Sequence, residues 1–117
     1  MTPTATIIAP TPLDLAGLTV HIIPLAKSDP HGKLADAELH FITGPLEGMK
    51  LIGFGIWQQR NGGTRNVTFP ARSYAVNGER RSFSILRPSA YPGERLSAQQ
   101  RVVTFILQAY DQFLANN

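Results

Sequence analysis

The sequence predicts one small α+β domain, in which three to five antiparallel strands are closed by a C-terminal amphipathic helix. Three observations predict it. Short segments of alternating apolar and polar residues recur between residues 18 and 86. Clusters of Gly, Pro and Asn separate these segments. A run with helical apolar periodicity ends the 117-residue chain, which is long enough for one core.

The N-terminal third holds an arm and two strands. Residues 1–16 are rich in Thr and Pro and lack periodicity, so we expect a flexible arm outside a single domain of residues 17–117. Residues 18–23 alternate as a first strand, which Pro24 ends. A turn cluster at 28–32 precedes a half-buried strand at 35–41.

The middle of the chain predicts shorter strands. In residues 50–57, Ile52, Phe54 and Ile56 are expected on one face, and the glycines on the other face indicate a bend or the close approach of another backbone. Residues 67–69 form a short strand that stops at Pro70. Asn77-Gly78 is typical of a type I′ hairpin, although its flank at 73–76 is weakly strand-like. Residues 81–86 alternate as the last strand, before Pro88.

The C-terminal segment predicts a helix. Ser97 and Gln100 have the spacing of a capping box. The apolar stripe that follows must pack on a sheet face, because nothing else in the chain could cover it. It consists of Val103, Ile106, Leu107, Tyr110, Phe113 and Leu114.

Composition excludes several classes of site. The chain has no cysteine, which excludes disulfides, thiolate catalysis and thiolate zinc sites. Residues 1–12 lack the basic start and unbroken apolar run of a secretory signal, and no run is long enough to span a membrane. We expect a cytoplasmic protein without membrane contact.

We also expect no catalysis, no cofactor, no small-molecule substrate and no metal. His21, His31 and His40 show no paired spacing typical of a metal site. Asp36 and Glu38 share a strand face, which is better explained as a solvated outer face than as an acid/base pair. No nucleophile elbow or phosphate loop is present.

Charge is unevenly distributed along the chain. The formal net charge is +3, but all eight arginines lie in residues 60–101, which carry a net charge of +6. Arg suits bidentate contact with phosphate. A solvated basic face is the alternative explanation. The candidate nucleic-acid-binding residues are Arg60, Arg65, Arg72, Arg80, Arg81, Arg87 and Arg101.

Strand alternation orders these candidates. Arg81 shares a face with Phe83 and Ile85, whereas Arg80 shares one with serines, so we expect Arg80 to be more exposed. If the strands beside Arg72 and Arg87 are neighbours, their ends would gather several guanidinium groups at one edge of the sheet, as a footprint for phosphates.

The serial order of several segments resembles a known family. These segments are Gly32-Lys33-Leu34, residues 51–57, Val67-Thr68-Phe69-Pro70-Ala71-Arg72, Asn77-Gly78-Glu79-Arg80-Arg81, Arg87-Pro88 and a helix ending near Tyr110. Together they resemble the stage V sporulation protein G (SpoVG) family, the septation-regulator proteins of bacteria. The resemblance covers about residues 18–110.

The resemblance implies a small α+β fold, dimerisation through strands and a nucleic-acid-binding regulatory role without catalysis. It implies basic binding positions at Arg72, Arg81 and Arg101. The chain departs from the family by its N-terminal arm and by Pro70-Ala71-Arg72-Ser73, which stands where the family has Pro-x-Lys-Arg.

Two functions remain open from the sequence. One is a homodimeric regulator that binds DNA or RNA through its arginines. The other is a protein-interaction module that docks a partner on an exposed strand edge or on the face of Trp57, with the arginines only solvating the surface.

Overall fold

The α+β fold is confirmed by a computed structural model of the chain, which describes residues 5–7, 17–27, 31–59, 62–89 and 95–116, without the side chains of 5–7 and 95–97. These residues form seven strands and one helix, more strands than we expected. In chain order they are β1 (Ala5–Ile7), β2 (Leu18–Pro24), β3 (Lys33–Phe41), β4 (Lys50–Gln58), β5 (Arg65–Thr68), β6 (Ala71–Val76), β7 (Glu79–Ser84) and α1 (Arg95–Ala115).

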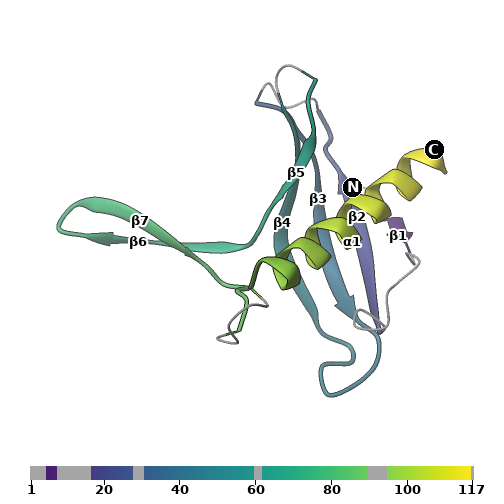
Figure 1. The fold of residues 1–117 in the computed structure, drawn as a ribbon, viewed down its shortest axis with the longest axis horizontal. Coiled ribbons are helices and arrows are strands. Elements are labelled where there is room, and N and C mark those ends of the chain that lie inside the picture. Colours follow the sequence, from purple (N-terminus) through teal and green to yellow (C-terminus); the bar gives the residue numbers. More distant parts are fainter. Residues whose placement is uncertain (1–4, 8–16, 28–30, 60–61, 90–94, 117) are drawn as a thin grey trace.

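Five strands form one antiparallel sheet in chain order, β1-β2-β3-β4-β5 (Figure 1). We did not expect a strand within residues 1–16, but Ala5–Ile7 pairs with β2 opposite residues 20–22. Short strands with Thr and Pro around them give little periodic signal, and pairing with a neighbour decides their structure. The turn residues 28–30, Arg60 and Asn61 lie outside the described part of the chain.

The core lies between one face of this sheet and α1. Most strand side chains that alternate toward the helix are buried, as the period-two pattern predicted for residues 18–23 and 35–41. The helix crosses this face of the sheet (Figure 1), and it has the expected role of cover. The buried residues are Val20, Ile22, Ala35, Ala37, Leu39, Phe54, Ile56, Phe105, Ile106, Ala109 and Tyr110.

The helix buries part of the stripe that we expected, with Ile106 and Tyr110 in the core, together with residues outside that stripe. Phe105 and Ala109, which we left out, are buried, whereas Leu114, which we included, is 44% exposed. Two overlapping apolar stripes satisfy the same helical spacing, and the side of the helix that carries Phe105, Ile106 and Ala109 faces the sheet. The side chain of Ser97 lies outside the described part, so the capping box stays a prediction. Within the described ranges, no helix combines the length and apolar character needed to cross a membrane.

Strand β4 departs from simple alternation. Its register with β3 shifts between Ala37 and Leu39, so that Leu39 pairs with Leu51 while Ala37 pairs with Phe54. Ile52 and Gly53 of β4 together lie opposite the single β3 residue Glu38, and Ile52 is 57% exposed instead of buried. A bulge of this kind turns a side chain to the other face and bends the strand. The expectation that Ile52 shares the buried face of β4 is therefore wrong.

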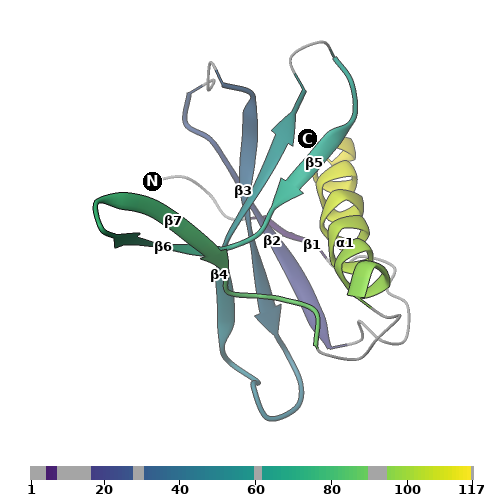
Figure 2. The ribbon, with the colours of Figure 1, turned by 60° about the vertical axis from the view of Figure 1, so that its left-hand side comes forward.

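Strands β6 and β7 form a separate two-stranded sheet that projects from the body (Figures 1 and 2). We call this hairpin the arm; it is a different segment from the N-terminal arm that we expected at residues 1–16. In both views it extends away from the five-stranded sheet and from α1. All of its residues, 71–84, are exposed. The flank that we judged weakly strand-like is a full strand of the arm, because β7 supplies its pairing.

Candidate nucleic-acid interface

The arm ends in the tight turn that Asn77-Gly78 predicted. Asn77 and Gly78 have φ of 53° and 80°, as a type I′ turn requires at both central residues. At the other end of the arm, the backbone N–H of Ile85 donates to the carbonyl of Pro70 at 2.8 Å. The arm is therefore a closed ribbon with a defined register.

The register gives the arm two unlike faces. Arg72 pairs with Phe83, and Tyr74 pairs with Arg81, so these four side chains share one face. The rings of Tyr74 and Phe83 lie 5.8 Å apart in a tilted arrangement on this face. We call it the aromatic face. The opposite face carries Ala71, Ser73, Ala75, Arg80, Ser82 and Ser84.

Three candidate arginines lie on the arm. Arg72 and Arg81 are diagonal neighbours on the aromatic face. Arg80 is on the opposite face with the serines, as alternation predicted. Arg81 Nε lies 3.7 Å from Glu79 Oε1, and both side chains are more than half exposed. An exposed pair at this distance contributes little. The arm therefore presents guanidinium groups on both faces.

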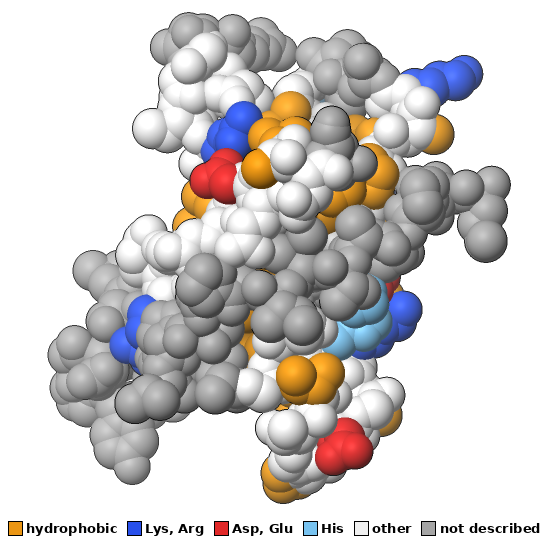
Figure 3. Space-filling model, turned by 90° about the vertical axis from the view of Figure 1, so that its right-hand side faces the viewer, with side chains coloured by type: hydrophobic (Ala, Val, Ile, Leu, Met, Phe, Trp, Pro, Cys, Tyr) orange, Lys and Arg blue, Asp and Glu red, His pale blue; other side chains and the backbone are white. Residues whose placement is uncertain are grey.

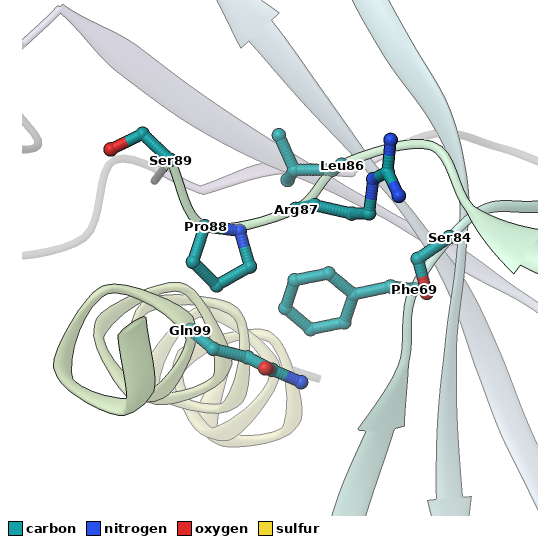
Figure 4. A pocket seen from close by; sticks show the side chains of 7 residues that line it. All are labelled: Phe69, Ser84, Leu86, Arg87, Pro88, Ser89 and Gln99. Carbon is teal, nitrogen blue, oxygen red and sulfur yellow. The ribbon is translucent and has the colours of Figure 1, made fainter. Parts of the chain in front are cut away.

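Arg87 lies at the base of the arm, beside a hollow of about 500 Å³. Figure 4 shows the rings of Phe69 and Pro88 facing this hollow, with Gln99 reaching it from α1. The side chain of Arg87 extends over the same opening, on the side where Ser84 ends β7. The strand ends thus place Arg87 next to the arm, although the arginines of the arm point to two faces and do not form one edge.

Two further candidates lie elsewhere, and one is not described. Arg65, at the end of β5 remote from the arm, donates from Nη1 to Asp111 Oδ1 at 2.9 Å. Its guanidinium carbon also lies 5.0 Å from the ring centroid of Tyr110. Arg101 is half-buried on α1. Arg60 lies outside the described residues.

Trp57, the residue of the alternative hypothesis, is held on the outer face of the sheet. Its indole Nε1 donates to Thr68 Oγ1 at 2.9 Å, and the ammonium of Lys33 lies 5.8 Å from its ring. Gly55 lets the indole lie over the strand, because a Cβ there would lie 2.8 Å from Trp57 Nε1. The ring is half-buried against its own sheet.

The outer face also holds a cluster that the sequence reasoning missed. His21 pairs across β2 and β3 with Glu38, and the rings of His21 and His40 stack with centroids 3.4 Å apart and planes 5° apart. His40 Nε2 lies 3.0 Å from Glu38 Oε1, and the ammonium of Lys50 donates to the same oxygen at 3.3 Å. Figure 3 shows histidine side chains (pale blue) together at the surface, beside lysine or arginine (blue).

The surroundings of the cluster shift the pKa values of His21 and Glu38. Burial lowers the pKa of His21, and the charge of His40 lowers it further, against a smaller opposing effect of Glu38. Burial alone would raise the pKa of Glu38, but hydrogen bonds from His40 and Lys50 outweigh it and hold the pKa below its ordinary value. The cluster therefore favours a neutral imidazole next to a charged carboxylate.

Comparison with known proteins gave no relative. No family model, no curated protein and no solved structure matches this chain.

A signal for the histidine cluster was present in the sequence. The apolar alternation of residues 18–23 and 35–41 already placed His21, Glu38 and His40 on the polar face of consecutive strands. We judged the histidines by their spacing along the chain, which does not reveal neighbours across a strand pair. The expected solvated outer face is correct for Asp36, which lies 2.6 Å from Lys33 Nζ, but Glu38 is only 15% exposed.

Proposed function

We propose that this chain is a nucleic-acid-binding regulatory protein, without catalysis, that acts as a cytoplasmic homodimer. The observation that carries the proposal is the arm, an exposed two-stranded ribbon with Arg72, Arg80 and Arg81 on its surface. The resemblance to the stage V sporulation protein G family points to the same function and is part of the proposal.

The shape and charge of the arm support nucleic acid as the ligand. A two-stranded ribbon fits the major groove of B-DNA, and several DNA-binding proteins use one there. Guanidinium groups on such a ribbon can contact the phosphates that border the groove. Arg87 at the base of the arm extends this basic surface toward the body.

The exposed apolar side chains of the arm support the homodimer. Tyr74, Val76 and Phe83 on the aromatic face, with Ile85 next to it, are each about 40–55% exposed. A two-stranded hairpin is marginally stable alone, and Tyr, Phe and Arg are enriched in the centres of protein interfaces. A two-fold axis would set two aromatic faces against each other. Arg72 and Arg81 have long apolar stems, which let their charged ends reach the rim of such a contact.

A salt titration tests nucleic-acid binding. We expect the chain to bind DNA or RNA with an affinity that falls steeply with salt, by about one log-log unit for each phosphate contact. Arg80→Ala should lower this slope by about one. Lys27→Ala removes the same charge from an exposed side chain far from the arm in sequence, and we expect the slope to stay as in the parent chain.

Sedimentation tests the dimer separately. Tyr74→Ser with Phe83→Ser should convert dimers to monomers at micromolar concentration, whereas Arg80→Ala should leave the dimer intact. A parent chain that sediments as a monomer would rule out the homodimer. An affinity that does not depend on salt would rule out the arginine surface.

The protein-interaction module is the alternative outcome. It requires no nucleic-acid affinity above that of any protein of charge +3, together with loss of a protein partner on Trp57→Ala. Thr68→Val would release the indole Nε1 from its intramolecular partner and test whether Trp57 can turn outward to such a partner.

A further inference from the structure

We propose that His21, Glu38 and His40 bind a divalent transition-metal ion of the zinc class on the outer face of the sheet. These residues lie on β2 and β3 and not on the arm, so the inference does not depend on nucleic-acid binding. Two imidazoles and one carboxylate form a ligand set found in zinc and non-haem iron proteins.

Distances between the ligand atoms support the site. One ligand atom from each of the three residues lies within 4.8 Å of the others. Two ligands bonded to the same tetrahedral zinc ion at about 2.1 Å lie about 3.4 Å apart. His40 Nε2 and Glu38 Oε1, at 3.0 Å, already have nearly this separation. Imidazole lone pairs lie in the ring plane, so binding requires side-chain rotations that open the stack of His21 and His40 and bring both lone pairs to a common point.

The backbone that carries the ligands is rigid. The three residues lie on β2 and β3, which pair over residues 18–24 and 35–41 and have neighbours on both sides. On the opposite face of these strands, Val20, Ile22, Ala35, Ala37 and Leu39 are buried in the core. Ligands on paired strands keep their relative positions better than ligands on loops. Side-chain exposures of 15% for Glu38 and 26% for His40 leave the site open to an entering ion.

The ligand types select the class of metal. Imidazole nitrogen suits Zn²⁺, Co²⁺, Ni²⁺ and Cu²⁺, whereas Mg²⁺ and Ca²⁺ prefer an all-oxygen shell. Three protein ligands fill three positions of a tetrahedral ion and leave the fourth to water or to another ligand. The geometry therefore favours an exchangeable ion over a closed structural one.

Lys50 is the cation now beside the carboxylate. Its ammonium lies 3.3 Å from Glu38 Oε1, and its side chain is 52% exposed. A metal ion bound through that oxygen would repel the ammonium, and an exposed lysine can swing into solvent. Lys50 should therefore weaken metal binding by competition. Its removal should strengthen the site, a result that no merely structural role of the cluster predicts.

The experiment uses the untagged, chelator-treated full chain, titrated with Zn²⁺ by calorimetry and with Co²⁺ by visible absorption. We expect one ion per chain. His21→Ala, His40→Ala and Glu38→Gln should each weaken binding by about tenfold or more, and Lys50→Met should tighten it. His31→Ala, which removes the exposed third histidine, should change nothing. Circular dichroism of each variant shows whether it is folded, and Glu38→Gln keeps the side-chain shape.

Three results would overturn the inference. If no Zn²⁺ binding is detected at about millimolar Zn²⁺, the proposed site does not exist. Binding that is equal in the parent chain, His21→Ala and His40→Ala places the ion elsewhere. Half an ion per chain, coupled to association of two chains on sedimentation, would show a site made between copies and not within one.

Discussion

Gly53 and Pro70 meet at the point where the arm leaves the body. A Cβ on Gly53 would lie 2.8 Å from the Cβ of Pro70, closer than two such atoms can approach. Gly53 is also one of the two bulged residues of β4, with φ of 107°. Pro70 is buried, and its carbonyl accepts the hydrogen bond that closes the arm. The bulge in β4 and the direction of the arm therefore depend on the same contact.

Gly53→Ala should destabilise the protein and redirect the arm. The new methyl group adds overpacking of about 1–3 kcal/mol to the strain of a positive φ. Gly48→Ala is the matched control, because Gly48 has φ of 88° and nothing within 4 Å of its missing Cβ, so it should cost only about 1 kcal/mol. Chemical denaturation measures both. Equal losses would show that Pro70 does not constrain this site.

Phe105→Ala should cause the largest loss of stability among helix substitutions. The side chain is 1% exposed in the core, and truncation of a buried Phe costs about 3–5 kcal/mol. Leu114→Ala, on the stripe that we expected to be buried, should change the free energy of unfolding by about 0.5 kcal/mol or less. A larger effect at Leu114 than at Phe105 would mean that the other stripe faces the sheet.

Much of the fold follows from local pattern. Apolar and polar side chains alternate cleanly in residues 18–23 and 35–41, because one face of each strand packs in the core and the other faces solvent. The structure confirms both strands. The helix and the Asn77-Gly78 turn follow in the same way. Ala5–Ile7 and the exposed Ile52 could not be predicted, since the first depends on pairing with β2 and the second on a bulge that alternation does not encode.

The candidate sites were predictable to a different degree. The faces of Arg80 and Arg81 follow from alternation, and the structure agrees. The projection of the arm does not, because no local pattern says whether a hairpin joins a sheet or leaves it. For His21, alternation gives the face but not the neighbour: a register offset by two residues would place it opposite Asp36 or His40 instead of Glu38.

Arg65→Ala should separate structural from nucleic-acid-binding arginines. Arg65 pairs with Asp111 and lies over Tyr110, so its loss should cost about 1 kcal/mol of stability. Because it lies far along β5 from the arm, we expect the salt dependence of nucleic-acid affinity to match that of the parent chain. A slope reduced as much as in Arg80→Ala would extend the binding surface to this end of the sheet and contradict an interface confined to the arm.

Stability should fall as the pH is lowered through the titration of His21. In the folded chain, burial and the charge of His40 hold the pKa of His21 below its ordinary 6.5. Below about pH 7 the unfolded chain therefore takes up this proton more readily than the folded chain does, and the free energy of unfolding decreases until the folded form is protonated too. Well above pH 6.5 neither state is protonated and this loss is absent. Glu38, whose pKa is held below its ordinary value by hydrogen bonds from His40 and Lys50, keeps its charge over this window.

Urea denaturation of chelator-treated protein at pH 7.5, 6.5 and 5.5 measures the effect. His21→Gln removes the group that titrates, so the decrease in unfolding free energy between pH 7.5 and 5.5 should become smaller than in the parent chain. His31→Gln removes an exposed histidine outside the cluster and should leave the decrease in place. If the two variants lose the same amount of pH dependence, the stacked pair of His21 and His40 does not couple protonation to folding. The chelator matters because an ion bound to these imidazoles would compete with the proton and add its own pH dependence.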